Sequence, residues 1–182
     1  MSDTPINSLE DCLPLQAATA ASKEPTKSQM PINSLEDIWP LQAALNARAG
    51  IDTQAMGRQL AAVEQEGQAP SEERLAVGRA LKNYIDALGS ECHELQDCLS
   101  WKHWYREARE GRQHELRDIQ NARVEATDIL FFWISICQLL GLEPQDVYRL
   151  YAKKLGINHR RQDEDRTQEQ HSQHEQENRS VV

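Results

Sequence analysis

The sequence predicts an all-α protein, a helical bundle with a polar segment at each end. Two observations support this. Between residues 31 and 162 the apolar residues recur at intervals of three and four, as on one face of a helix. In the same region no alternating apolar run bounded by turn residues predicts a strand. The length of 182 residues fits a single domain with tails.

The N-terminus contains a near-perfect repeat. PINSLEDCLPLQAA begins at Pro5 and PINSLEDIWPLQAA begins at Pro31. The copies differ at two positions, Cys12/Ile38 and Leu13/Trp39. Only the second copy continues into a helical pattern, so we expect it to join the fold. Residues 1–30 are expected to be a disordered segment, as chain termini often are.

Helix signals follow in order along residues 31–162. The segment LQAALNARAG predicts a short helix ended by Gly50, and TQAMGRQLAAVEQEG predicts another. A long helix is expected from Pro70-Ser71, with two glutamates in its first turn. Its inward stripe is Val77, Leu81, Tyr84, Leu88, Leu95 and Cys98.

Two more helices are expected before the tail. One covers about 115–140, with an inward stripe that includes Val124, Phe131 and Leu139. The other is EPQDVYRLYAKKLG, with a proline near its start and a glycine near its end. Residues 163–182 contain almost no apolar side chain and cannot offset their ordering entropy, so a disordered polar tail is expected.

Composition argues against several classes of function. A net charge of −9 disfavours binding to nucleic-acid phosphates. The longest nearly apolar run, 129–142, is shorter than the roughly 20 residues that cross a bilayer. No signal peptide is visible, and the four cysteines form no CxxC pair. We therefore expect a cytoplasmic protein that binds neither nucleic acid nor membrane.

Two acidic pairs stand where apolar residues are due. In the long helix the stripe passes from Leu88 to Glu91 and Glu94, and in the later helix it meets Glu125 and Asp128. Residues three apart share a helix face, and buried carboxylates need a positive partner. Neither stripe supplies an obvious Arg or Lys, so a hard divalent cation, Mg²⁺, is expected between the pairs. The alternative is that these acids lie in water at the edge of the stripe.

A second ExxD pair, Glu115 and Asp118, competes with this interpretation. Its neighbours His114, Arg117 and Gln120 are polar, so a solvated helix face explains it. The pair Glu125/Asp128 leads directly into the apolar run and is preferred as half of the site.

Five segments in order resemble the all-α nucleoside triphosphate pyrophosphatases, and more narrowly the dimeric dUTPases. They are LQAALN, the ExxE of ECHEL, WKHWY, the ExxD of VEATDIL with an asparagine one turn before it, and YAKKLGINHRRQ. The similarity covers about Leu41 to Gln162. Where the family has a histidine after DIL, this chain has Phe131, and DED replaces the usual Gly-Tyr after RQ.

The resemblance implies a homodimeric helical bundle, residues 31–162, that hydrolyses dUTP to dUMP and pyrophosphate with Mg²⁺; it leaves open whether dUDP is used. The implied metal ligands are Glu91, Glu94, Glu125 and Asp128. One of the first two, Glu91 or Glu94, would take the proton of the attacking water. The implied substrate-binding residues are Gln42, Asn46, Trp101, Lys102, Trp104, Asn121, Lys153, Asn158 and Arg161.

Each substrate contact has a chemical rationale. The amides of Gln42 and Asn46, four apart on one face, match the edge of uracil. The indoles of Trp101 and Trp104 are suited to stacking on a base. Lys102, which stands between them, is expected to bind phosphate together with Lys153 and Arg161. On the later segment the cationic side chains suit phosphates and the asparagine suits sugar or phosphate. Two other functions stay open: a MazG-like or dCTP-type pyrophosphatase with another base preference, and a non-catalytic regulatory helical dimer.

Overall fold

The structure is a computed structural model and describes residues 32–65, 67, 71–163 and 171–181. These residues belong to one unit of the chain, Ile32–Val182. Within them the protein has helices and one isolated β-bridge, Leu99 to Leu116, and no strand, which confirms the all-α class. The expected N-terminal segment 1–30 lies outside the described residues. Among the described helices none is by itself long and apolar enough to span a membrane; the helices Ile119–Leu139 and Pro144–Asp163 pass that test only as a pair bent by 100°.

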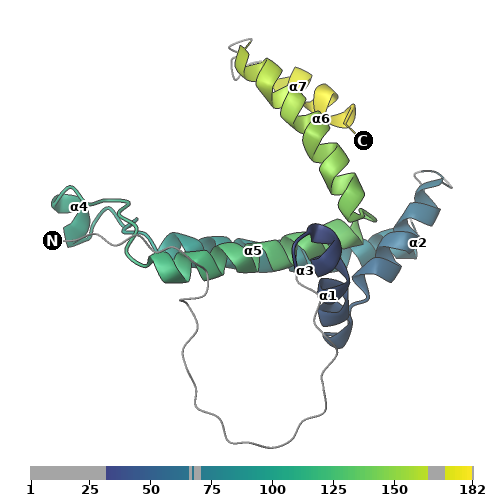
Figure 1. The fold of residues 1–182 in the computed structure, drawn as a ribbon, viewed down its shortest axis with the longest axis horizontal. Helices are drawn as coiled ribbons and strands as arrows, with labels where there is room; N and C mark the ends of the chain where they lie inside the picture. Colours follow the sequence, from purple (N-terminus) through teal and green to yellow (C-terminus); the bar gives the residue numbers. More distant parts are fainter. Residues whose placement is uncertain (1–31, 66, 68–70, 164–170, 182) are drawn as a thin grey trace, which may run out of the picture. The chain divides into compact units, whose positions relative to one another are not determined.

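The centre of the fold is a pair of long helices lying side by side, α3 (Glu72–Asp97) and α5 (Ile119–Leu139) (Figure 1). Ser71 caps α3 by accepting a hydrogen bond from the backbone N–H of Arg74. Asp118 caps α5 in the same way, from the N–H of Asn121. This cap lies three residues after the expected start at about 115, which explains why α5 begins later than the sequence pattern indicates.

One apolar cluster joins these two helices. Val77, Ala80 and Tyr84 of α3 pack with Leu139, which is fully buried at the end of α5. Leu81 and Phe132 lie against this cluster at partly exposed positions. The inward stripe expected for α3 is therefore confirmed where it meets α5.

Helix α1 (Leu35–Arg48) begins earlier than the sequence suggests. A capping box starts it: Ser34 and Asp37 exchange hydrogen bonds between side chain and backbone. Pro40 lies inside the helix, where it forgoes one backbone hydrogen bond without ending it. Trp39, 2% exposed, packs with Ile134 and Cys137 in a second apolar cluster and fixes α1 on α5.

Helix α2 (Thr53–Gln65) approaches the end of α5 at backbone contact distance. The approach occurs at Gly57, where an added Cβ would lie 2.1 Å from the carbonyl oxygen of Gln138. Only a residue without a side chain fits there. Gly57 therefore sets how closely α2 and α5 pack.

A connection with a short helix, α4 (Arg106–Arg109), links α3 to α5. After α5 the chain enters α6 (Pro144–Asp163), which runs through Gly156 instead of ending near it. A further helix, α7 (His171–Arg179), stands in the region where the sequence predicts a disordered polar tail. Arg161 of α6 binds Glu177 at 3.0 Å and Lys153 donates to the carbonyl of Val181 at 3.0 Å, so polar contacts order residues that have little apolar surface.

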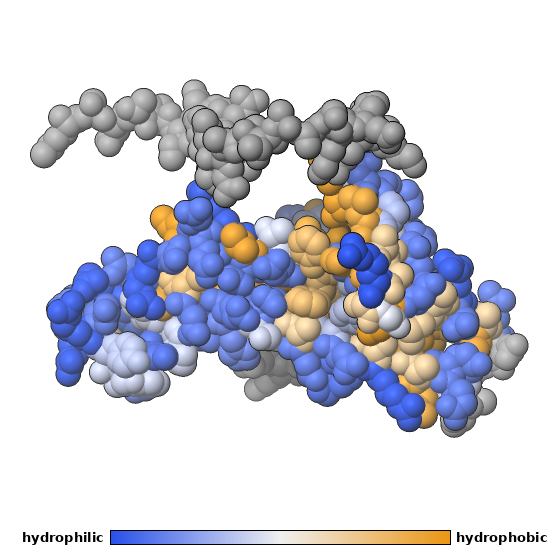
Figure 2. Space-filling view, turned by 90° about the horizontal axis from the view of Figure 1, so that it is seen from below, coloured by the Kyte–Doolittle hydropathy of each residue, from blue (hydrophilic) through white to orange (hydrophobic). Residues whose placement is uncertain are grey.

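The apolar stripe expected for α5 is wrong at two positions. Val124 is 51% exposed and Phe131 is 42% exposed. The reason is the rotation of α5, which turns Glu125 toward α3 and so turns Val124 away from it. Figure 2 shows apolar residues among the polar ones on one face of the protein.

The expected homodimer stays a prediction.

Candidate metal centre

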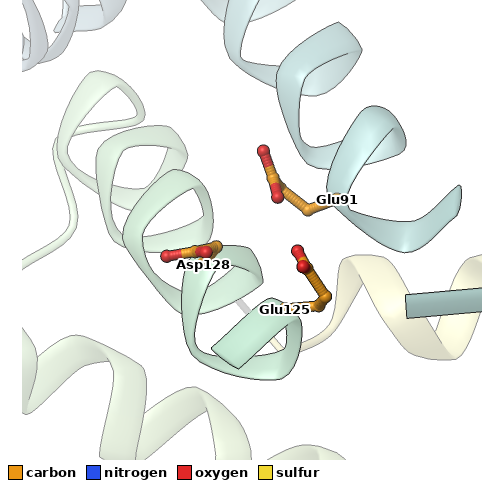
Figure 3. A group of neighbouring side chains, drawn as sticks. All are labelled: Glu91, Glu125 and Asp128. Atoms are coloured by element: carbon orange, nitrogen blue, oxygen red, sulfur yellow. The ribbon is translucent and has the colours of Figure 1, made fainter. Parts of the chain in front are cut away.

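Three carboxylates from the two central helices converge on one point. Glu91 comes from α3, and Glu125 and Asp128 come from adjacent turns of α5 (Figure 3). Each offers an oxygen atom, and these atoms lie within 4.8 Å of one another. Glu125 is 7% exposed, and the other two are partly buried. Three members of the predicted ligand set therefore come together, and both acidic pairs are represented. We call these residues the carboxylate group.

Asn121 is the amide partner of the carboxylate group. It lies one turn before Glu125 on α5, and its Nδ2 donates a hydrogen bond of 3.0 Å to Glu125 Oε1. The same Nδ2 lies 3.5 Å from the sulfur of Cys98. An amide donor holds the Glu125 carboxylate in one orientation but adds no positive charge. Asn121 therefore positions a member of the group, and its expected contact with substrate stays a prediction.

The carboxylate group has an excess of negative charge. Burial, and then the nearby carboxylates of Glu94, Asp128 and Glu125, raise the pKa of Glu91 above its ordinary value, and a hydrogen bond shared with Glu125 adds to this. Among the described residues no Lys, Arg or His forms a salt bridge with any of the three. Carboxylates so close together favour a proton or a cation between them.

Glu94 stands apart from the carboxylate group. Its side chain is exposed, and Oε1 accepts a hydrogen bond of 3.4 Å from Ser90 Oγ on the preceding turn. It is close enough to raise the pKa of Glu91 through its charge. The predicted set of four ligands is thus represented by three converging carboxylates, with Glu94 beside them on the same helix.

The other ExxD pair has a structural explanation. Asp118 is the N-cap of α5, and Glu115 forms a salt bridge of 2.8 Å with Arg112. Both side chains are exposed. The interpretation of this pair as solvated is confirmed, and its role is to begin α5 and to hold the loop before it.

Gln42 and Asn46, the amides expected to recognise uracil, lie in a buried hydrogen-bond network. Gln42 Nε2 donates to Asn46 Oδ1 at 2.9 Å and to Ser135 Oγ at 3.1 Å. Asn46 Nδ2 donates to Ser135 Oγ at 2.9 Å and to Thr53 Oγ1 at 3.2 Å. Gln138 accepts from Thr53 at 2.6 Å, and its own amide donates to the carbonyl of Trp39. The network ties together α1, α2 and α5.

Sequence reasoning missed three members of this network, Thr53, Ser135 and Gln138. For Ser135 and Gln138 the available signal was their position inside the apolar run FFWISICQLLGL; no such signal marks Thr53. A hydroxyl or amide at such a position needs partners once it is buried. Gln42 and Asn46 of α1 are the partners of Ser135.

Gln42 also lines an apolar groove between α1 and α5 with a volume of about 260 Å³. Thr127 and Phe131 line the same groove. Thr127 directly precedes Asp128, and Phe131 follows it by one helical turn. The lining of the groove therefore includes sequence neighbours of Asp128 and one amide, that of Gln42. An apolar groove with one polar group is a common form of ligand site.

The aromatic segment after α3 forms its own cluster. Trp101 and Trp104 meet edge to face with ring centroids 6.1 Å apart, and Trp101 Nε1 donates to Asp97 at 2.8 Å. The ammonium of Lys102 lies 5.5 Å from the Trp101 ring centre and 5.3 Å from that of Tyr105. Trp101, Lys102 and Tyr105 border a cavity of about 160 Å³ beyond the end of α3, and Trp104 lies outside its lining. They are not members of the carboxylate group.

The predicted phosphate ligands of the closing segment all lie on α6. Lys153 and Arg161 are engaged by the C-terminal segment, through Val181 and Glu177, and Asn158 is exposed. None of the three belongs to the carboxylate group. Their expected contacts with phosphate stay a prediction that would need a different partner for α6.

No protein-family model, curated protein or solved structure matches this chain. The resemblance to dimeric dUTPases therefore depends on the motifs alone.

Proposed function

We propose that this protein is a Mg²⁺-dependent nucleotide pyrophosphohydrolase that converts dUTP to dUMP and pyrophosphate and so limits uracil in DNA. The observation that carries the proposal is the convergence of Glu91, Glu125 and Asp128 from two helices without a salt bridge among the described residues. Three hard oxygen donors within 4.8 Å of one another are a donor set suited to Mg²⁺. Bound there, the metal would neutralise triphosphate charge.

Different residues of the chain would hold the metal, accept the proton and bind the base. Glu125, oriented by Asn121, would be a fixed ligand, since its carboxylate is already held by a hydrogen bond of 3.0 Å. Glu91, which faces Glu125 from the other helix, would be a second ligand and the first candidate to accept the proton of the attacking water. Glu94, exposed one turn later, is the second candidate for this role. The apolar groove would hold the base beside the amide of Gln42.

Base selection by Gln42 requires that its amide face the groove in a fixed orientation. The amide nitrogen of Gln42 is held by Asn46 and Ser135, which leaves its carbonyl oxygen to accept from a ligand. Uracil carries one N–H between two carbonyl groups, so it would donate a hydrogen bond to this fixed acceptor. This supports uracil over cytosine, whose corresponding ring nitrogen is an acceptor.

The test is a panel of dUTP, dCTP, dTTP, dATP and dGTP with Mg²⁺, with pyrophosphate release as the measurement. We expect release from dUTP far above the others and none without the metal. The variant Gln42→Ala should lower the preference for dUTP over the other four nucleotides while leaving Mg²⁺ binding unchanged. Equal hydrolysis of all five would replace the dUTP assignment with a MazG-like activity, and preference for dCTP would replace it with a dCTP-type activity.

Glu91→Gln and Glu115→Gln form a matched pair for the same assay. The first removes a carboxylate from the group, and the second removes an exposed one that is paired with Arg112. Release should be abolished in the first and retained in the second. If the native protein releases no pyrophosphate from any of the nucleotides, the enzyme proposal is wrong and the non-catalytic helical dimer is favoured.

A further inference from the structure

The surface that holds α1 recognises features that occur twice in this chain. We call this surface the α1 seat; it is formed by residues of α2, α5 and α6 that contact α1. On its floor Trp39 packs with Ile134 and Cys137, and the Trp39 carbonyl accepts from Gln138 Nε2 at 2.8 Å. At its entrance the hydroxyl of Tyr148 donates to Glu36 at 3.2 Å.

The first copy of the repeat preserves most of these contacts in sequence. With the offset between the copies, Ser8 and Asp11 correspond to the capping box of Ser34 and Asp37. Glu10 corresponds to the residue that meets Tyr148. Gln16 corresponds to Gln42, which donates to Ser135. Gln138 donates to the backbone carbonyl of Trp39, so this hydrogen bond does not depend on the side chain at that position and could also form with Leu13.

The first copy lacks three contacts that the second makes. Cys12 replaces Ile38, which packs against the cluster of Trp39, Ile134 and Cys137. Leu13 replaces Trp39, so less apolar area would be buried against Ile134 and Cys137. Ala20 replaces Asn46, so the amide that binds Ser135 and Thr53 would be missing. These differences make the second copy the preferred occupant and the first a weaker one.

We propose that residues 5–20 are a second occupant of the α1 seat in the same chain, which takes the place of α1 when α1 is displaced. The connection to α2 permits this, because residues 21–52 would span from the first copy to Thr53 as a loop. Lengthening a loop disfavours its closure by only roughly threefold per doubling. In the exchanged state Gln16 stands at the groove in place of Gln42.

Four chains test the exchange: native, Leu13→Asp, Trp39→Asp and the double variant. Hydrogen exchange read by mass spectrometry distinguishes the copies, because their peptides differ in mass. A charge at the buried position of Trp39 rejects the second copy. We expect Trp39→Asp to transfer protection to peptides within residues 9–20, slowing their exchange on the order of tenfold relative to the double variant. Leu13→Asp alone should leave α1 protected.

Two outcomes overturn the proposal. Equal exchange of residues 9–20 in Trp39→Asp and in the double variant means that the first copy has no access to the seat. Protection that disappears on hundredfold dilution means that the occupant comes from a second chain.

A gain-of-contact variant covers the case in which Trp39→Asp fails to fold. Cys12→Ile, Leu13→Trp and Ala20→Asn together give the first copy the contacts of the second, in a chain whose α1 is native. We expect slowed exchange to appear in residues 9–20, with a matching loss in residues 35–46. Exchange at residues 9–20 as fast as in the native chain overturns the proposal. Pyrophosphate release has no part in these measurements, so their result is independent of the proposed function.

Discussion

Glu91 of α3 and Glu125 of α5 face each other across the central helix pair, with carboxylate oxygens within 4.8 Å. Their helices are joined by a long connection, so the meeting is made by tertiary packing. Asn121 fixes the Glu125 side of the pair, and Asp128 adds a third carboxylate from the next turn. This relationship turns two sequence motifs into a candidate centre for a divalent cation.

Replacing Glu125 with Gln should remove Mg²⁺ binding while preserving the fold. Gln is nearly isosteric, and its amide oxygen can still accept from Asn121, but it carries no charge. We expect Mg²⁺ affinity to fall by about ten- to a hundredfold or more, measured by calorimetric titration. Without metal, the melting temperature should rise, because one of three close negative charges is gone.

Glu115→Gln is the control for that experiment. Glu115 is exposed and paired with Arg112, so its loss should change stability by no more than about 1 kcal/mol and leave Mg²⁺ affinity unaltered. Equal effects of the two substitutions would mean that Mg²⁺ responds to overall charge and not to the carboxylate group.

The stability of the metal-free protein should carry a pH dependence from Glu91. Burial and the nearby carboxylates raise the pKa of Glu91 above 4.5, so the folded chain binds this proton more tightly than the unfolded chain. The contribution of Glu91 to the free energy of unfolding is therefore full below about pH 4.5 and is lost as pH rises through the raised pKa. Comparing urea unfolding of the native chain and Glu91→Gln across this range isolates the contribution.

Mg²⁺ should act on the same group in the opposite direction. A bound cation favours the ionised carboxylate, so Mg²⁺ affinity should rise with pH through the same window and binding should release protons. Calorimetry in buffers of different ionisation enthalpy measures the release. Affinity that stays constant across the window would contradict a role for Glu91 as a ligand.

Gly57→Ala should strongly destabilise the protein. The new Cβ would lie 2.1 Å from the backbone carbonyl of Gln138, so α2 would have to move away from α5 and the buried network would open. We expect a loss of about 1–3 kcal/mol or more in the free energy of unfolding, measured with urea.

Gly78→Ala supplies a matched control in α3. Nothing lies within 4 Å of an added Cβ there, and alanine favours helix over glycine, so this variant should gain about 0.5–1 kcal/mol. A loss of stability in both variants would indicate that the effect is not the α2–α5 contact.

Ser135→Ala should test the buried network by itself. Ser135 is fully buried and connects Gln42 and Asn46 of α1 with α5, so its loss leaves amide groups unsatisfied. We expect a cost of about 1–3 kcal/mol in urea unfolding. Ser90→Ala, which removes an exposed hydroxyl 3.4 Å from Glu94, should cost far less. Similar costs would show that the network adds little beyond a surface hydrogen bond.

The helical class, the principal helices and the inward direction of three acidic residues could be predicted from the amino-acid sequence. Periodicity carries this information because a helix face is set by local geometry. The periodicity predicted that Glu125 and Asp128 face inward, but it also placed Val124 on the inward face. A stripe of apolar residues does not fix the rotation of a helix against its neighbour.

Which residues meet is a property of the packed helices. The rotation of α3 turns Glu91 toward Glu125 and leaves Glu94 exposed, whereas both members of the Glu125/Asp128 pair reach the site from α5. Tertiary packing also directs Gln42 and Asn46 to Ser135, and Lys153 to the C-terminal segment. These outcomes depend on how helices far apart in the chain cross and pack, and no local pattern encodes that.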